Sequence, residues 1–415
     1  MTGPLWTRLP DGWLTGQVRN VATVTLGKML QSKDSGSDMP TPYMRAANVQ
    51  PNGVLALDDV NEMWFSEAEL EQLSIRAGDV VVVEGGQGGF GRAAYVENDL
   101  PGWGFQNSIN RLRPIGDFDG RFIAFYLIAL RASGYIRAYC NVVSMPHLTA
   151  EKLARIPIPL PPVKQQRAIA DYLDRETARI DTLIEEQQTL VRLLAERRVA
   201  VMADPFGQAH PTAPLGAVLE ELIDHRGKTP GKVGDKTDDF TDEGVPVVSA
   251  IHIKNGQISW DERERFVPYW MFEKWMPVRL RTGDVLLTSE APLGNVAQVP
   301  TDAPLVLSQR LFALRSREDI LDSTYLRFFL ESDRGQALLR DGASGSTVSG
   351  IRQSRLVQVP VPVPPVDEQR RVSQRIREQI TKIDTLMAET ARFVELSKER
   401  RAALITAAVT GQIDV

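Results

Sequence analysis

The chain of 415 residues contains one cysteine, Cys140, and four histidines. A single cysteine cannot form an intramolecular disulfide, and the histidines are too scattered to show a zinc-ligand spacing. The start of the chain lacks the basic and apolar regions of a signal peptide, and the longest apolar run, residues 122–130, is far shorter than the ~20 residues of a membrane span. We therefore expect a cytoplasmic protein with no metal site and no membrane partner.

Positive charge is not in excess either, since 48 Lys and Arg stand against 53 Asp and Glu for a net charge of -5. Residues 1–153 hold 13 basic and 16 acidic side chains, and residues 203–356 hold 18 and 22. The net charge of the chain therefore gives no indication that it binds nucleic acid. The composition, 43% hydrophobic and 24% charged, is that of a globular protein, and the length suggests two or three domains.

An internal repeat with an offset of 203 residues organises the chain. The segment IPIPLPPV at 156–163 matches VPVPVPPV at 359–366, and 18 of the 47 positions in 156–202 are identical in the second copy without a gap. In both copies the proline-rich segment leads into a long stretch that lacks Pro and Gly and is rich in helix formers. The repeat predicts two long helices.

Apolar residues recur along both predicted helices at alternating steps of four and three, which is typical of a coiled-coil seam. In the first helix these residues are Ile169, Leu173, Ile180, Leu183, Leu190, Leu194 and Val201. In the second they are Val372, Ile376, Ile383, Leu386, Phe393 and Leu404. We expect the two helices to pack against each other, the alternative being amphipathic helices that each lie on a domain core.

Polar residues interrupt both seams at matching places. They are Glu176 and Gln379, Gln187 and Thr390, and Arg197 and Arg400. An antiparallel arrangement about an axis near Gln187 brings Glu176 level with Arg400, and Gln379 level with Arg197. Such pairs would fix the register of the coiled coil at some cost in stability.

The two remaining segments, each of roughly 150 residues, share a skeleton. Turns into buried strands match at 76–80 and 281–285, Asn110–Leu112 matches Gln309–Leu311, and helical patterns follow in both segments. The predicted fold class is α+β, with two similar mixed α/β domains separated by two long helices that form an antiparallel coiled coil, as a pseudo-two-fold internal repeat. The expected boundaries are 1–153 for the first domain, 154–205 for the first lead-in and helix, 206–356 for the second domain, and 357–415 for the second lead-in, helix and tail.

Catalytic motifs are nearly absent. Residues 86–91 fit G-x-G-x-x-G, but a strand-like pattern follows them where a dinucleotide site needs a helix, and residues 290–294 of the repeat could not cradle a pyrophosphate. No Walker lysine, nucleophile elbow or His-Glu-x-x-His pair occurs. We predict that the chain is not itself a catalyst.

Two similar but different domains joined by long helices suit the reading of two short sequences on one DNA duplex. The competing hypothesis is a coiled-coil scaffold that joins protein partners and does not bind DNA. The scaffold explains the helices but not two α/β domains that have diverged while keeping one skeleton.

Several segments also resemble the specificity subunit of type I restriction-modification systems. They are Leu9–Trp13, the two proline-rich segments with their Gln-Arg pairs, the two Ile-Asp-Thr-Leu motifs and the ending Arg400–Asp414. The resemblance covers the whole chain and implies a non-catalytic subunit for phage defence, with one target recognition domain for each half of a bipartite DNA target. It also implies that the internal repeat is circular, so that the N-terminal segment, up to about Arg19, packs near the second helical region.

The partners that the resemblance implies are double-stranded DNA, two copies of an adenine-N6 methyltransferase subunit that uses S-adenosylmethionine, and a motor-nuclease subunit that uses ATP and Mg. We expect no cofactor in this chain.

Base edges are read by Arg at guanine and by Asn or Gln at adenine, so polar loop residues are the DNA-binding candidates. They are Arg45, Asn48, Gln87, Asn107 and His147 in the first domain, and Arg226, His252, Ser289, Asn295, Ser346 and Arg352 in the second. His147 and His252 could equally be buried or capping histidines, and Arg111 and Arg310 lie at strand-like positions that favour a structural role. Because neither domain is net basic, we expect the isolated chain to bind DNA weakly.

Overall fold

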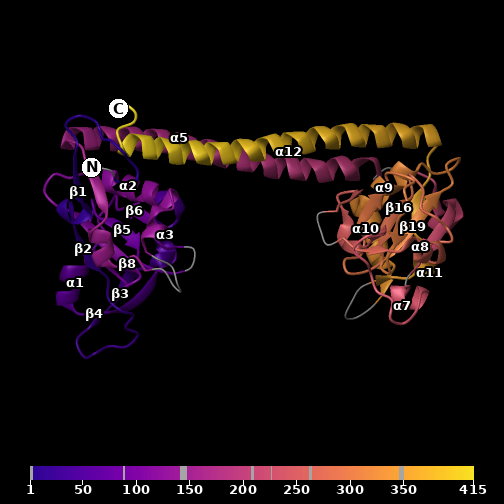
Figure 1. The fold of residues 1–415 in the computed structure, drawn as a ribbon, viewed down its shortest axis with the longest axis horizontal. Coiled ribbons are helices and arrows are strands. Elements are labelled where there is room, and N and C mark those ends of the chain that lie inside the picture. The colour runs from indigo at the N-terminus through magenta and orange to yellow at the C-terminus, as the bar shows by residue number, and fades with distance from the viewer. Residues whose placement is uncertain are drawn as a thin grey trace. The chain divides into compact units, whose positions relative to one another are not determined.

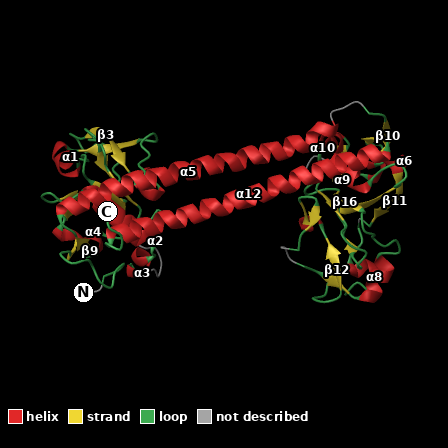
Figure 2. Cartoon of the chain, turned by 90° about the horizontal axis from the view of Figure 1, so that it is seen from above, coloured by secondary structure: helices red, strands yellow, loops and turns green. Residues whose placement is uncertain are grey.

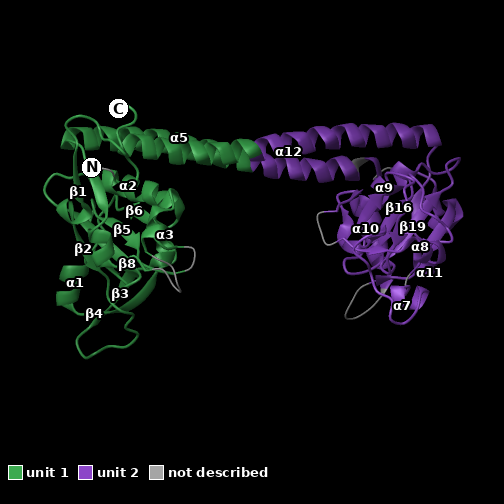
Figure 3. Ribbon diagram, viewed as in Figure 1, with its two compact units in different colours: residues 1–188, 392–415 green, residues 189–391 purple. Residues whose placement is uncertain are grey.

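The computed structural model describes residues 3–86, 89–140, 147–206, 210–225, 227–260, 264–344 and 350–415 (Figure 1). The chain forms two compact units, the first of Met1–Gln188 with Arg392–Val415 and the second of Thr189–Ala391 (Figure 3). Each unit therefore combines one α/β domain with part of each long helix.

The domain of the first unit is built on an antiparallel four-stranded sheet of order β2-β8-β5-β6 and a three-stranded sheet of order β4-β3-β7. The strands of the larger sheet are β2 (Ala22–Leu26), β5 (Val80–Val83), β6 (Ala93–Tyr95) and β8 (Ile109–Pro114). Those of the smaller sheet are β3 (Met39–Met44), β4 (Asn61–Phe65) and β7 (Gly104–Phe105). The proline-rich lead-in forms β9 (Pro157–Leu160), which pairs with β1 (Leu14–Gln17). The helices are α1 (Glu67–Leu73), α2 (Gly120–Ala132), α3 (Tyr135–Tyr139) and α4 (Ala150–Ala154).

The domain of the second unit repeats this topology, with sheets of order β11-β19-β16-β17 and β15-β12-β18. The larger sheet contains β11 (Leu219–Asp224), β16 (Val285–Thr288), β17 (Val296–Gln298) and β19 (Leu311–Ser316). The smaller contains β12 (Val245–Val248), β15 (Phe266–Val267) and β18 (Val306–Leu307). The lead-in β22 (Pro360–Pro362) pairs with β10 (Thr212–Pro214), as β9 does with β1.

The second domain contains two short antiparallel strand pairs. Their strands are β13 (Ile253–Lys254), β14 (Gln257–Ile258), β20 (Ala343–Ser344) and β21 (Gly350–Ile351). The helices are α6 (Leu215–Val218), α7 (Pro230–Val233), α8 (Tyr269–Trp275), α9 (Ser323–Glu331), α10 (Asp333–Asp341) and α11 (Gln353–Leu356). Of these, α8 to α11 follow the order of α1 to α4.

The central strands β5 and β16 are buried on both faces, and all of their residues are apolar except Thr288. Val80 and Val82 join a core with α2 and the long helices, whereas Val81 and Val83 join a core with the smaller sheet. Successive side chains of a strand point to opposite faces, so one run of valines serves two cores. This confirms the predicted turn into a buried strand.

The two long helices are α5 (Val163–Ala203) and α12 (Val366–Val409), each continuous along its length (Figure 2). Both begin after a Pro-Pro pair, and α12 ends before Gly411, which has a positive φ of 68°. In the first unit, Ile169 packs in the core that holds Val409, and Ile184 packs with Val394. The helices are therefore antiparallel there, as predicted.

The predicted seam is correct at most positions but wrong at Leu183, Leu190, Leu386 and Phe393, whose side chains are exposed. Next to them in sequence, Ile184 and Val394 are buried. Apolar side chains stand next to each other at these places, so the alternating pattern could not distinguish the contact face from its neighbour.

Two ion pairs link the helices at positions that match under the 203-residue offset. Asp181 bonds Arg401 at 2.8 Å in the first unit, and Arg198 bonds Asp384 at 3.0 Å in the second. The expected partners Arg197 and Arg400 are exposed, because each residue along a helix is rotated by about 100° and only one arginine of each Arg-Arg pair faces the other helix.

The other predicted register residues lie on the helices with varied exposure. Thr390 is buried, Gln187 and Glu176 are partly buried, and Gln379 lines a pocket together with Arg197. Among the described residues, ion pairs between the helices join Asp181 to Arg401 and Arg198 to Asp384, whereas Gln379 and Arg197 line one pocket, as expected of residues that lie level.

The N-terminal segment packs on the end of α12, as the resemblance implied. Trp6 shares the first core with Ile405, Ala408 and Val409. A Cβ on Gly411 would stand only 2.4 Å from the Pro10 ring, so only glycine fits this approach.

Candidate nucleic-acid interface

In the first unit, four segments meet at one end of the two sheets. The Glu84 amide donates to the Ser108 carbonyl at 2.8 Å, and the Leu148 amide donates to the Glu84 carbonyl at 2.7 Å. The Ala46 amide donates to Ser108 Oγ at 3.2 Å. We call this region, made of residues 45–48, 84–86, 106–108 and His147, the first loop edge.

The second unit repeats the two bonds of Glu84, and its bond from Ser308 to Val248 matches the bond from the Gln106 amide to the Met44 carbonyl at 2.9 Å. The Ser289 amide donates to the Arg310 carbonyl at 2.8 Å, the Ile351 amide donates to the Ser289 carbonyl at 3.0 Å, and the Ser308 amide donates to the Val248 carbonyl at 3.0 Å. Residues 249–252, 289–290, 308–310 and 350–352 form the second loop edge. The same scaffold thus presents different side chains in the two units.

Three of the predicted residues of the first domain lie together at the first loop edge. Arg45 forms an ion pair with Asp59, Asn107 is partly buried, and the His147 side chain is half-exposed with Nδ1 2.9 Å from Glu84 Oε2.

Asn48 and His252 are buried at equivalent places, where they stabilise tight turns. Asn48 Oδ1 accepts a hydrogen bond from the Arg45 amide, and its amide nitrogen donates to two backbone carbonyls. His252 Nδ1 accepts from the Ser249 amide in the same way, and its ring lies 5.0 Å from that of Trp260. The structure therefore gives both residues a structural role, the alternative already stated for His252, so neither is placed to reach a base edge.

The other predicted residues of the second domain are dispersed. Ser289 is buried at the loop edge, Arg352 is exposed there, and Asn295 is exposed beside the β13 hairpin, where its side chain donates to the Ile253 carbonyl at 3.2 Å. Gln87, Arg226 and Ser346 lie outside the described residues.

Arg310 is a surface residue of the second loop edge that the sequence comparison misplaced. Strand register pairs Leu112 with Val80 and Leu314 with Val285, so Leu314 is the counterpart of Leu112 and Arg310 is the counterpart of Ser108. The expected match of Asn110–Leu112 with Gln309–Leu311 is therefore wrong by three residues. The arginine of the first domain, Arg111, is buried as expected, where desolvation lowers its pKa to about 10.

Two cations at or beside the loop edges, Lys28 and Arg310, are paired with carboxylates. Lys28, which follows β2, lies 2.5 Å from Glu69, and this bond lowers the pKa of Glu69. Arg310 lies 3.4 Å from Glu290, with its side chain 55% exposed. Since a paired cation has less positive potential to offer a phosphate, the edges suit base reading better than strong backbone binding.

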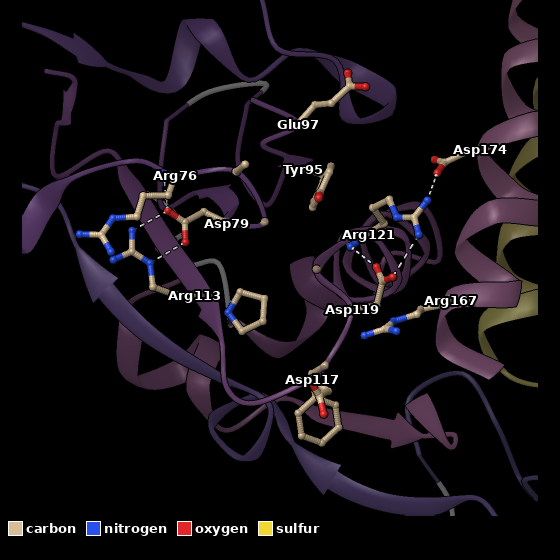
Figure 4. Close-up of a pocket in the computed structure, with 15 residues that line it drawn as sticks. Arg76, Asp79, Tyr95, Glu97, Arg113, Asp117, Asp119, Arg121, Arg167 and Asp174 are labelled. Atoms are coloured by element: carbon tan, nitrogen blue, oxygen red, sulfur yellow. Dashed lines mark hydrogen bonds and ion pairs between the residues drawn. The ribbon is translucent and has the colours of Figure 1, made fainter. Parts of the chain in front are cut away.

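A polar pocket of about 800 Å³ lies between the sheet of the first domain and the first turns of α5 (Figure 4). Arg113 makes two 2.8 Å bonds to Asp79, and a buried pair of the same kind joins Arg315 and Asp284 in the second unit. Across the pocket, Arg121 bonds Asp119.

Arg121 also bonds two carboxylates of α5, Asp171 at 2.7 Å and Asp174 at 2.9 Å. Burial lowers the pKa of Arg121, but its hydrogen bonds to these carboxylates and to Asp119 raise it overall. These groups join the domain to its helix and form no nucleophile–base pair.

Other site classes find little support. No group of three His, Cys, Asp or Glu side chains able to hold a metal occurs among the described residues, and no helix of the described chain is long and apolar enough to cross a membrane. As predicted, the glycine-rich residues 86–91 lead into a strand, β6, instead of a helix.

Comparison with known proteins gives a consistent result. The model of the type I restriction modification DNA specificity domain matches residues 10–192 and 219–392. The chain is 23% identical over 310 residues to the type I restriction enzyme MjaVIII specificity subunit of Methanocaldococcus jannaschii, a match that covers 70% of each chain. It is 22% identical over 410 residues to the EcoKI specificity subunit of Escherichia coli, with 91% of this chain and 84% of that one covered.

Solved structures share the fold. A chain from a type I R-M system superposes with a TM-score of 0.70 at 20% identity, over 98% of this chain and all of that one. The HsdS subunit from Thermoanaerobacter tengcongensis superposes with a TM-score of 0.62 at 20% identity over all of both chains.

Proposed function

The chain belongs to the type I restriction modification DNA specificity family, and on that premise we propose that its two loop edges read the two halves of one bipartite double-stranded DNA target. The observation that carries the proposal is the repeated scaffold of the edges. The bond from Glu84 to Ser108 and the bond from Ser289 to Arg310 are the same backbone bond, yet the side chains around them differ. A shared frame with different side chains is what two recognition domains of one protein need in order to read different sequences.

Base reading at each edge follows from the chemistry of the exposed groups. Arg310 and Arg352 suit the guanine O6 and N7 acceptors, and Asn107 suits adenine. Glu84 and Glu290 can accept a hydrogen bond from the cytosine amino group. Glu290, which pairs with Arg310 in the free protein, and Glu84, which lies beside His147, would in this way also take part in reading.

Phosphate binding by the chain alone would be weak. Both domains carry more acidic than basic side chains, and Lys28 and Arg310 already have carboxylate partners. Non-specific affinity for DNA depends on the number of phosphates neutralised, so partner subunits would supply most of the basic groups that contact the DNA backbone.

The partners are adenine-N6 methyltransferase subunits, and an exposed apolar stripe on each long helix would be the surface to which they bind. The stripe consists of Leu183, Leu190 and Leu193 on α5 and Leu386, Phe393 and Leu396 on α12. The two triplets match under the 203-residue offset, which fits two copies of one partner. Methylation with S-adenosylmethionine, and cleavage by a motor-nuclease subunit with ATP and Mg, would then belong to the partners, and the chain itself would be a non-catalytic subunit acting in the cytoplasm.

A protein-joining scaffold explains these observations less well. It would need the helices and the apolar stripe, but it gives no reason for two domains that keep strand order and loop bonds while their exposed side chains differ.

The test is genome-wide mapping of adenine methylation in a host that expresses the chain with the methyltransferase encoded beside it. We expect a motif of two specific halves separated by a non-specific spacer, which disappears when the chain is omitted. Chain-independent methylation, with both proteins soluble and associated, would contradict the proposal.

A further inference from the structure

Each domain is joined to its long helix by a buried glutamine at the same place in the repeat. Gln166 and Gln369 lie in the first turn of α5 and α12 and are 1% and 0% exposed. In the sequence they are recognisable only as the identical glutamines of the two Gln-Arg pairs. Their side chains connect three parts of each unit.

In the first unit, Gln166 Oε1 accepts a hydrogen bond from the Asp119 amide at 3.1 Å, and its amide nitrogen donates to the Pro161 carbonyl at 2.8 Å. In the second, Gln369 Oε1 accepts from the Asp322 amide at 2.8 Å, and its amide nitrogen donates to the Pro364 carbonyl at 2.7 Å and the Ile320 carbonyl at 2.9 Å.

These backbone groups lie outside regular structure and need a side-chain partner. Asp119 and Asp322 are the N-cap residues of α2 and α9, and their side chains accept bonds from the first turn of those helices. Pro161 and Pro364 precede the long helices. A buried amide and a buried carbonyl left without partners would each cost a desolvation penalty, and glutamine offers a donor and an acceptor on one flexible stem.

Both joints share apolar packing, since Ile169 packs in one core with α2 and Ile376 packs in one core with α9. The polar side-chain contacts other than those of the glutamine differ between the units. The first unit uses Arg121 with Asp171 and Asp174. The second uses Ser373, whose Oγ lies 3.3 Å from the Asp322 carboxylate. The glutamine therefore makes the polar side-chain contact that both joints share.

We propose that Gln166 and Gln369 are positioning residues that fix the angle of each recognition domain on its own long helix, and thereby restrict the length of the DNA spacer that the chain accepts. The inference rests on the proposed function. It concerns spacing and not the identity of the bases, since neither side chain lies at a loop edge.

A small rotation of the domain about the joint moves its far side by a distance comparable to the rise of one base pair. A domain of about 150 residues has a radius of gyration of ~15 Å, so a point on its far side is ~30 Å from the joint. A rotation of about 6° moves that point by ~3 Å, close to the ~3.4 Å rise of one base pair. A joint that loosens by a few degrees would therefore admit a neighbouring spacer length.

The test measures methyl transfer by the complex of the full chain with its methyltransferase subunit, on duplexes with the cognate spacer and with one base pair more or fewer. Gln369→Met, which keeps the volume and removes both polar groups, should lower the ratio of cognate to altered-spacer rates about tenfold. Gln369→Asn, which keeps the groups on a shorter stem, and Gln166→Met serve as second variants if Gln369→Met fails to fold.

Ser332→Ala is the matched control, because Ser332 is 1% exposed and its hydroxyl bonds the Phe329 carbonyl and the Gly335 amide within the second domain, away from the joint. It should lower stability but leave the spacer ratio within twofold of wild type. Folded glutamine variants that keep the wild-type ratio, or a control that loses it equally, would overturn the inference. A wild-type complex that methylates no bipartite duplex would instead refute the proposed function, and this inference with it.

Discussion

Replacing Arg401 with methionine should cost the first unit about 2 kcal/mol of unfolding free energy, and replacing the matching Arg198 should cost the second unit less than ~1 kcal/mol. The Arg401 side chain is 7% exposed, lies 2.8 Å from Asp181 and also donates to the Asn52 carbonyl at 3.2 Å. Removing one partner of a fully buried pair costs ~3–5 kcal/mol, but Asp181 is 35% exposed and regains water, so the expected value is smaller. Arg198 and Asp384 are 28% and 50% exposed, which places their pair among surface salt bridges.

The assay is urea unfolding followed by hydrogen-exchange mass spectrometry, which reads the two units separately. A double-mutant cycle of Arg401→Met with Asp181→Asn isolates the pair from the bond to Asn52. Equal costs for the two arginines, or no coupling between Arg401 and Asp181, would refute the assigned register.

Three further changes test other parts of the account. Glu290→Gln should raise the affinity of the isolated chain for non-specific duplex DNA severalfold at low salt, because it releases Arg310 and removes a negative charge; unchanged binding in a fluorescence anisotropy titration would contradict this. Leu193→Lys and Leu396→Lys should weaken association with the methyltransferase subunit at least tenfold by calorimetry while moving the melting temperature of the chain by no more than ~2 °C, since exposed substitutions cost little; equal association would exclude the apolar stripe as the docking surface. The pKa of Glu69 is below its ordinary value of 4.5 because Lys28 bonds the charged form. This bond therefore stabilises the first unit above pH 4.5, and its contribution is lost as the pH falls through the folded-state pKa. Lys28→Met should reduce the loss of stability on acidification, and an unchanged dependence of stability on acid pH would count against the bond.

Much of the architecture followed from the repeat, because a duplicated proline-rich lead-in and helix constrains the rest of the chain. The circular arrangement was implied by the family resemblance, and the packing of Trp6 against Ile405, Ala408 and Val409 confirms it. The buried strand at 80–83 could be found because an unbroken run of valines suits only a strand covered on both faces.

The finer contacts could not be predicted, for identifiable reasons. In the Arg-Arg pairs, both residues carry the same charge, and a helix rotation that the sequence does not reveal decides which one faces its partner. Leu183 and Ile184 are both apolar, so hydrophobicity alone could not assign the seam. Arg111 and Arg310 shared a local sequence pattern, but the strand register places one in the core and the other at a loop edge.

The roles of the polar loop residues could not be predicted from the sequence, because a polar residue in a loop can either stabilise the loop or bind a ligand. Asn48 illustrates the first case, since its three hydrogen bonds to backbone groups close a turn. His147 and Arg310 have half-exposed side chains at the two loop edges, and a ligand-binding role for them stays a prediction.

The central claim is that each loop edge reads one half of the DNA target. The most direct measurement compares the genome-wide adenine methylation motifs produced with the wild-type chain, with Arg310→Ala and with Asn107→Ala, each expressed with the same methyltransferase subunit. We predict that each substitution relaxes one half of the motif, a different half for each, and leaves the other half and the spacer length unchanged. A substitution at one edge that alters both halves, or two substitutions that relax the same half, would contradict the account.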